Sequence, residues 1–117
     1  MALLGFKKRF APLVEAGTKR QTIRAKRKDG KNPHPGERLY LYTGLRTKAC
    51  RKLGEGICKS VEEITIESHE INVAGAWLPH APVEELAIRD GFDSFEQILA
   101  FFEKEHGLPF WGLLIEW

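Results

Sequence analysis

Asp90 is the residue of this sequence whose position most needs a chemical explanation. It falls on the apolar stripe of an expected helix, with Val83 and Leu86, and in the last turn of that helix, where the helix dipole disfavours negative charge. A cation is needed to compensate, and Lys19 or Arg24 would supply it. A carboxylate beside a cation in a partly dry cleft is a candidate general base. The alternatives are a structural salt bridge and a helix end that faces solvent.

Lys19 and Thr22 place an ammonium group and a hydroxyl group early in the chain. Residues three apart on a regular strand point to opposite faces, so these two converge only if Lys19 belongs to a turn after Gly17 or if a bulge intervenes. Thr22 and Arg24, by contrast, share a face of any regular strand. A threonine in a strand and an exposed lysine are also common for β propensity and solubility alone.

The charge of the chain is divided between its two halves, although the whole chain carries only +2. Residues 1–52 hold 15 Lys and Arg against 3 Asp and Glu, a net charge of +12, and residues 53–117 hold 3 against 13, a net charge of −10. A basic half on one side of the fold would attract phosphates. Surface ion pairs between the halves are the alternative.

Candidate phosphate-binding residues lie in and near residues 26–36, a basic segment with two prolines and two glycines that predicts a loop. Arg20, Lys26 and Arg27, together with Lys28 and Lys31, would hold the phosphate of a nucleotide or an RNA strand. The alternative is a solvated run of charge.

Two kinds of aromatic residue are candidates for stacking on a base. Tyr40 and Tyr42 share one face of an expected strand and would stack a base, or would pack in the core if that face points inward. Trp77, in a Trp-Leu-Pro-His segment, is the tryptophan that we select for stacking, with packing at the core or its rim as the alternative.

The elements that must position these residues follow the order β, short α, several β, two α, β. Alternating or apolar segments predict strands over residues 3–10, 18–25, 37–43, 57–67, 71–77 and 110–117. Helices are predicted over residues 11–16, from Pro82 to Gly91, and from a Ser94 capping box to Gly107, whereas residues 44–56 are predicted to form a loop. Such strands predict an α+β fold with a small barrel or sandwich.

Two motifs resemble signatures of the ASCH family, whose members are related to the PUA-like RNA-binding barrels. The segment Gly17-Thr18-Lys19-Arg20-Gln21-Thr22-Ile23-Arg24 resembles the family's Gly-x-Lys-x-x-Thr-Ile-Arg signature, and Ala87-Ile88-Arg89-Asp90-Gly91-Phe92 resembles its Asp-Gly-Phe segment. The resemblance implies one domain over residues 1–117, a β-barrel of about six strands with flanking helices, and a cleft where the two motifs meet.

The function implied by this resemblance belongs to one of three kinds. Similar domains include RNA-binding modules, a proposed ribonuclease and a small bacterial amidohydrolase that deacetylates N4-acetylcytidine. Lys19, Thr22 and Asp90 match the Lys, Thr and acidic residue of that amidohydrolase, with Glu85 as the alternative acidic residue. In such an enzyme Thr22 would attack the acyl carbon or position water, Asp90 would move protons, Lys19 would stabilise the oxyanion, and Arg24 would orient the substrate.

Other classes of protein receive little support. The four histidines are scattered, Cys50 and Cys58 form no metal-binding pair, and no phosphate-cradling glycine loop is present, so we expect neither a metal nor a cofactor. The apolar runs are too short to span a bilayer, and Lys7, Lys8 and Arg9 follow the apolar start, in the reverse of the order in a signal peptide. We therefore expect a cytoplasmic, monomeric protein with two free thiols and no membrane partner.

Overall fold

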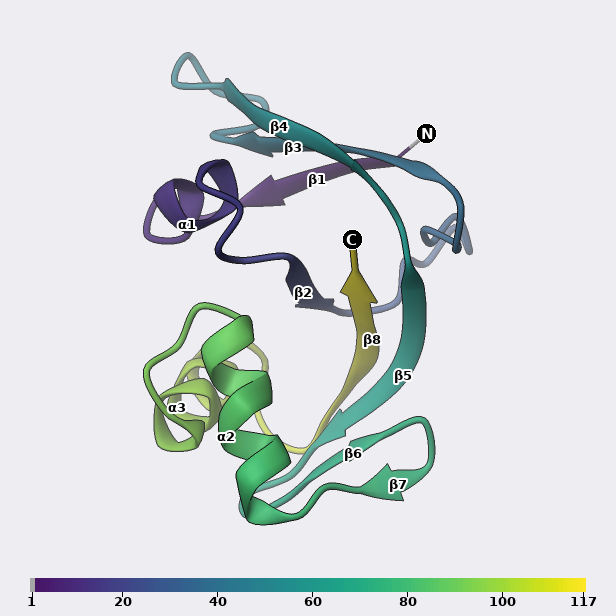
Figure 1. Ribbon diagram of the computed structural model, residues 1–117, viewed down its shortest axis with the longest axis vertical. Coiled ribbons are helices and arrows are strands. Elements are labelled where there is room, and N and C mark those ends of the chain that lie inside the picture. Colours follow the sequence, from purple (N-terminus) through teal and green to yellow (C-terminus); the bar gives the residue numbers. More distant parts are fainter. Residues whose placement is uncertain (1) are drawn as a thin grey trace.

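The computed structural model of the chain describes residues 2–117, and its elements follow the predicted order. Eight strands and three helices lie in the described part, which confirms the α+β class (Figure 1). The strands are β1 (Ala2–Phe6), β2 (Gln21–Arg24), β3 (Arg38–Thr43), β4 (Arg51–Ile57), β5 (Ser60–Ile66), β6 (Ile71–Val73), β7 (Ala76–Trp77) and β8 (Phe110–Glu116). The helices are α1 (Ala11–Glu15), α2 (His80–Arg89) and α3 (Phe95–His106).

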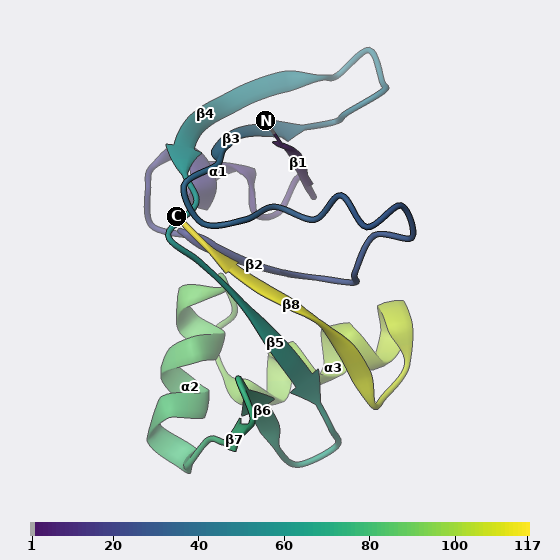
Figure 2. The same cartoon turned by 90° about the vertical axis from the view of Figure 1, so that its right-hand side faces the viewer.

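The strands form two open sheets, and residues 2–117 do not close the expected barrel of about six strands. One sheet has the order β1-β3-β4, with β1 parallel to β3, and the other has the order β2-β8-β5-β6-β7. The chain turns from β4 into β5 at a corner between the sheets (Figures 1 and 2). At this corner Cys58 N donates to Glu37 O and Lys59 N donates to Glu116 O, so the corner is bonded to both sheets.

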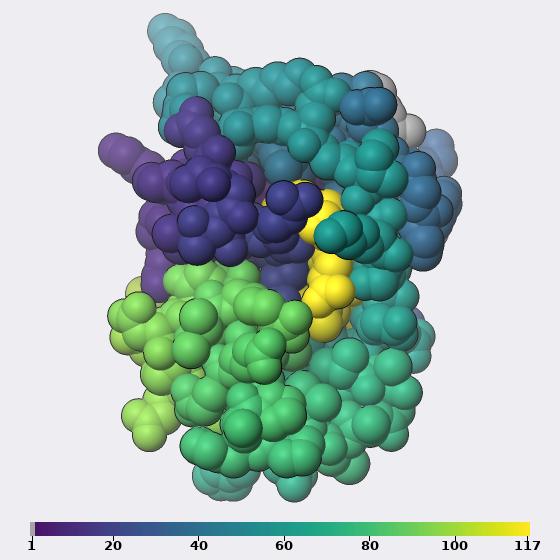
Figure 3. All heavy atoms as spheres, viewed as in Figure 1, coloured from purple at the N-terminus to yellow at the C-terminus, as the bar shows by residue number. Residues whose placement is uncertain are grey.

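One part of the core lies where α2 and α3 cover one face of the five-stranded sheet, and another part includes Leu4, Leu39 and Leu41 of the three-stranded sheet. Ile64 and Ile66 of β5, Leu86 of α2 and Ile98 of α3 are all buried members of this core. The N-terminal segment closes onto these helices along a visible seam (Figure 3). As predicted, α3 begins at Ser94, whose Oγ accepts a hydrogen bond from Gln97 N.

Several predicted boundaries were wrong. About half of the predicted loop over residues 44–56 belongs to strand β4. Gly54 and Gly56 interrupt the alternation of apolar and polar side chains that would indicate a strand. Gly56 is needed there, since an added Cβ would lie 2.9 Å from Trp117 Cδ1. The first strand ends at Phe6, and the strand expected over residues 71–77 is a hairpin that turns at Ala74 and Gly75.

The helices of the described residues lack the combination of length and hydropathy that a membrane-crossing helix requires. Of the two cysteines, Cys58 is buried and Cys50 is exposed, and both are free thiols.

Gly112 in β8 allows β2 to approach closely, and its substitution tests this packing. An added Cβ would lie 2.3 Å from Arg24 O and 2.8 Å from the Phe110 ring. We expect Gly112→Ala to lower the free energy of unfolding by about 1–3 kcal/mol, the usual cost of overpacking, in urea denaturation. Gly54→Ala in β4 is the matched control, because a Cβ there meets no atom within 4 Å. Equal stability of the two variants would contradict this close approach.

Candidate functional site

Lys19 lies in the turn between α1 and β2, so the alternation of the strand does not restrict it. Gly17 adopts a φ of +78°, and the backbone N–H groups of Thr18 and Lys19 both donate to Leu13 O. This turn aims the Lys19 side chain at the C-terminal end of α2, where Asp90 follows the last helical residue. The first motif and the Asp-Gly-Phe segment therefore meet, as predicted.

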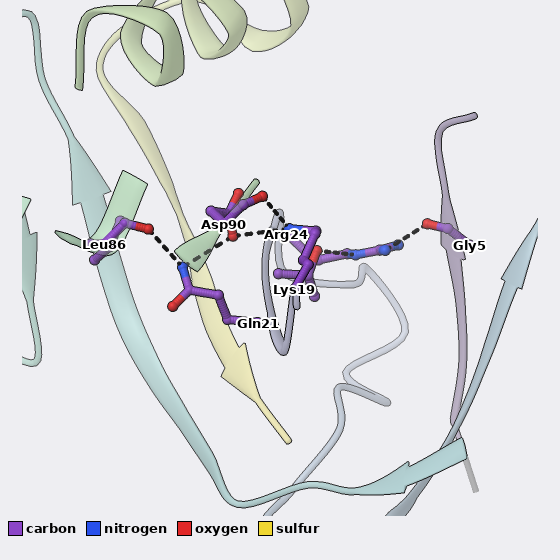
Figure 4. A network of polar contacts seen from close by, with 7 residues as sticks. Gly5, Lys19, Gln21, Arg24, Leu86 and Asp90 are labelled. Carbon is purple, nitrogen blue, oxygen red and sulfur yellow. Dashed lines mark hydrogen bonds and ion pairs between the residues drawn. The ribbon is translucent and has the colours of Figure 1, made fainter. Parts of the chain in front are cut away.

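The contact between Lys19 and Asp90 is buried on both sides (Figure 4). Lys19 Nζ lies 3.3 Å from Asp90 Oδ1 and donates to the Asp90 backbone oxygen at 2.6 Å, and the two side chains are 3% and 6% exposed. One cation thus compensates the buried carboxylate and also binds the carbonyl at the helix end, and it offsets the two costs expected from the sequence, a charge on the apolar stripe and a negative charge in the last turn.

Gln21 is a third member of this cluster, and sequence reasoning missed it. Its Nε2 donates to Leu86 O at 3.2 Å and to Asp90 Oδ1 at 3.1 Å (Figure 4). The side chain is almost completely buried, and its Oε1 has no partner among residues 2–117. No local pattern pointed to Gln21, because its two partners lie at the C-terminal end of α2, 65 and 69 residues away in the chain.

Thr22 and Arg24 share the other face of β2, as predicted. Arg24 Nε donates to Thr22 Oγ1 at 3.2 Å, and Arg24 Nη2 donates to Gly5 O at 2.6 Å, which links β2 to β1. The guanidinium group lies over the Phe6 ring at 4.9 Å. The threonine oxygen therefore accepts a charged hydrogen bond in a mostly dry place, an arrangement that favours negative charge on it.

Lys19, Thr22, Arg24 and Asp90 line one cavity of about 300 Å³. Its other walls are aromatic, with Phe6, Phe10, Phe92, Phe101, Phe102 and His106 among the lining residues. The four predicted chemical groups therefore lie around a single hollow bounded largely by rings.

The Asp-Gly-Phe segment builds this wall through its glycine. Gly91 adopts a φ of +98°, which a residue with a side chain rarely adopts, and an added Cβ would lie 3.0 Å from Phe10 Cδ1. The turn at Gly91 brings Phe92 edge-on to Phe10, with ring centroids 5.4 Å apart. Asp90 is thereby held at the end of α2 and beside an aromatic cluster.

Burial has a common effect on the charged groups of the cavity. It raises the pKa of Asp90 and lowers the pKa of Lys19, in each case because removal from water disfavours the charged form. Burial also lowers the pKa of Arg24 to about 10. Asp90 and Lys19 therefore have pKa values that lie closer together than those of an exposed pair, which suits a site that transfers protons.

The predicted phosphate-binding residues lie outside this cavity. Arg20 Nε donates to Trp117 O, Lys26 pairs with Glu63 at 2.6 Å, and Arg27 pairs with Asp29 at 2.9 Å. The exposed pair of Lys26 with Glu63 joins the basic and acidic halves of the chain, as does that of Lys7 with Glu105 at 3.4 Å, so the predicted charge separation is partly neutralised at the surface.

The predicted stacking residues and the alternative acid also lie outside the cavity. Tyr40 and Tyr42 are half-buried on one face of β3, and Lys52 Nζ lies over the Tyr40 ring. Leu39 and Leu41, on the other face, are buried. Trp77 is exposed on β7. Glu85 is exposed on α2 and lies 4.0 Å from Arg89.

The rings that line the cavity include instead those of Phe92, Phe101 and His106, which sequence reasoning did not select for stacking. Only Phe92 could be found from the sequence, through its place in the second motif.

Within residues 2–117, no three His, Cys, Asp or Glu side chains come together as metal ligands would. Comparisons with protein-family models, curated proteins and solved structures found no match to this chain.

Removal of the Lys19 cation tests the charge balance of the site. We expect Lys19→Met to lower the free energy of unfolding at pH 7 by about 3 kcal/mol or more, because it leaves a buried carboxyl without its cation. The folded state would then keep a proton that the unfolded state releases above about pH 4, so the loss grows as the pH rises from 4 to 7. Urea denaturation at pH 4 and at pH 7 measures this loss in the free energy of unfolding.

The control for this variant is Lys26→Met, which removes a cation from the exposed pair with Glu63. We expect it to change the free energy of unfolding by less than about 1 kcal/mol at either pH. Similar losses in the two lysine variants, or a Lys19→Met loss that does not depend on pH, would contradict the buried ion pair.

Proposed function

We propose that the cavity binds a pyrimidine nucleoside or an RNA nucleotide and hydrolyses the amide of an N4-acylated cytosine. The observation that carries this proposal is the buried contact of Lys19 with Asp90 in the wall of an aromatic cavity. The two motifs that resemble those of the ASCH family supply this wall, which supports assignment to that PUA-like family and its amidohydrolase member.

The dimensions and lining of the cavity support a base as the ligand. Its volume of about 300 Å³ lies at the lower end of the range for small-molecule sites. Proteins that bind unpaired bases stack them on aromatic side chains, and Phe101 and His106 are lining rings that are not fully buried. Arg24 and Lys19 supply donors for the polar edge of a pyrimidine.

The proposed reaction uses Asp90 as the base. Lys19 Nζ and Gln21 Nε2 both contact Oδ1 of its carboxylate, so we assign proton transfer to Oδ2. Oδ2 takes the proton of the attacking oxygen as the new C–O bond forms, and Lys19 stabilises the resulting oxyanion. The C–N bond then breaks, the proton passes from Asp90 to N4 of cytosine, and the products are the free nucleoside and a carboxylic acid.

The attacking oxygen belongs either to Thr22 or to water. If Thr22 attacks, its hydroxyl forms an ester with the acyl group, and a water molecule then cleaves the ester. If water attacks, Thr22 positions it. The hydrogen bond from Arg24 to Thr22 Oγ1 supports the first route by stabilising a developing alkoxide and the second by fixing the hydroxyl direction.

A non-catalytic RNA-binding module is the second candidate. The observation in its favour is the exposed basic loop between β2 and β3, which contains Lys26, Arg27, Lys28 and Lys31. Such a module would bind single-stranded RNA with an affinity that falls as the salt concentration rises, and would use the same cavity without turnover.

Acetate release from N4-acetylcytidine tests the proposed activity. We expect wild-type turnover and a decrease of at least about 10²-fold in kcat for Lys19→Ala and for Asp90→Asn, since removal of a positioned acid–base or oxyanion group has an effect of this size. Lys48→Ala is the matched control, because Lys48 is exposed and lines none of the cavities described.

Circular dichroism would establish that each variant is folded. Salt-sensitive retention of labelled single-stranded RNA without turnover would favour the binding module. Absence of both turnover and RNA binding in the wild type would contradict both candidate functions.

A further inference from the structure

A second cavity of about 260 Å³ adjoins the first, and the two share Arg24 and Ala25. It lies between β1 and β8, and residues from the loops after β2 and β3 complete its wall. Its lining includes Leu3, Leu4, Arg27, Asn32, Pro33, Arg46, Leu113 and Ile115. The end of β2 therefore separates two hollows, and Arg24 faces both.

Among residues 2–117, the charged residues that line the second cavity are all arginines, namely Arg24, Arg27 and Arg46. No acidic residue of the described part of the chain lines this cavity, in contrast to the first, where Asp90 lies. Arg27 pairs with Asp29 at its exposed edge, whereas Arg46 has no ion-pair partner within residues 2–117. The cavity thus carries positive charge that the protein itself balances only in part.

The base of the second cavity is apolar. Leu4, Leu113 and Ile115 are all buried, and they contribute to its lining. A low-dielectric base strengthens the attraction between an anion and the arginines around it. Arginine is also the residue best suited to hold phosphate oxygens, because its planar group donates two parallel hydrogen bonds.

Arg46 is held toward the cavity by a tight loop. It has a φ of +65°, which is unusual for a residue with a side chain. Beside it, Gly44 also has a positive φ, and an added Cβ there would lie 2.7 Å from Ala49 O. Thr47 Oγ1 donates to Gly44 O at 2.6 Å. A strained conformation of this kind persists only where the surrounding structure imposes it.

We propose that the second cavity binds a phosphate of a nucleotide whose base occupies the first cavity. This inference rests on the proposed function, and it names the substrate as an N4-acylated cytidine nucleotide rather than the free nucleoside. Arg27 and Arg46 contact the phosphate, and Arg24 lies between phosphate and base at the shared wall. A nucleotide joins its base to its phosphate through one ribose, which matches two adjoining cavities with a common wall.

The test compares kcat/KM for N4-acetylcytidine and for its 5′-monophosphate. We expect the wild type to prefer the monophosphate, and the ratio of the two constants to fall about tenfold or more in the Arg27→Ala/Arg46→Ala variant, which lacks two charged hydrogen-bond donors. Arg51→Ala is the matched control, since Arg51 pairs with Glu15 at the surface and lines neither cavity. A wild-type preference for the nucleoside, or an unchanged ratio in the double variant, would overturn the proposal.

A short single-stranded RNA with one N4-acetylcytidine identifies the source of the phosphate. A higher kcat/KM for the RNA than for the monophosphate assigns the phosphate to an RNA strand, and a higher value for the monophosphate assigns it to a free nucleotide. Both results support the phosphate site.

Binding measurements test the phosphate site independently of the proposed amidohydrolase activity. If the wild type hydrolyses none of these compounds, calorimetric titration with cytidine and with cytidine 5′-monophosphate still measures the contribution of the phosphate. Tighter binding of the monophosphate, lost in Arg27→Ala/Arg46→Ala and weakened by salt, would support the phosphate site without an enzyme. Equal binding of the two compounds, or binding of neither, would overturn it.

Discussion

The buried contact between Lys19 and Asp90 joins parts of the chain that lie 71 residues apart, and the arrangement of the site depends on it. A carboxylate at a helix C-terminus and a lysine inside an aromatic cluster are each costly in isolation. Together they satisfy one another, and the lysine also binds the carbonyl at the end of α2. The pair thus fixes the end of that helix against the turn that precedes β2.

The protein around this pair supplies rigid support in addition to the nearby charge of Arg24. Gln21 holds Asp90 Oδ1 and the Leu86 carbonyl, so both the side chain and the last turn of α2 are fixed. Phe10 lies under Lys19 Nζ at 5.0 Å, and Gly91 allows the helix end to approach that ring. The result is a dry wall with two titratable groups whose pKa values are displaced toward one another.

The sequence predicted the parts of this site that follow from local rules. A helix end with an acidic residue needs a cation, which predicts Lys19 or Arg24 as its partner, and Lys19 forms the ion pair. The Ser94 cap and the shared face of Thr22 and Arg24 follow from equally local geometry. The α+β class follows from the change of period between the strands and the last two helices.

The remaining features depend on packing between distant segments, which one sequence does not specify. The glycines of β4 concealed a strand that pairing with β3 stabilises. Tyr40 and Trp77 were selected for their chemistry, but the fold places the rings of Phe92 and Phe101 at the cavity. Arg46 was overlooked because only the tertiary structure brings its loop beside β1 and β8.

The most direct test of the central claim is an NMR titration of the Asp90 carboxyl carbon, with and without cytidine. If Asp90 lies buried in the wall of a base-binding cavity, its midpoint lies above the ordinary value of about 4, and cytidine shifts both its resonance and its midpoint. A midpoint at the ordinary value, together with a resonance that cytidine leaves unchanged, would contradict the account.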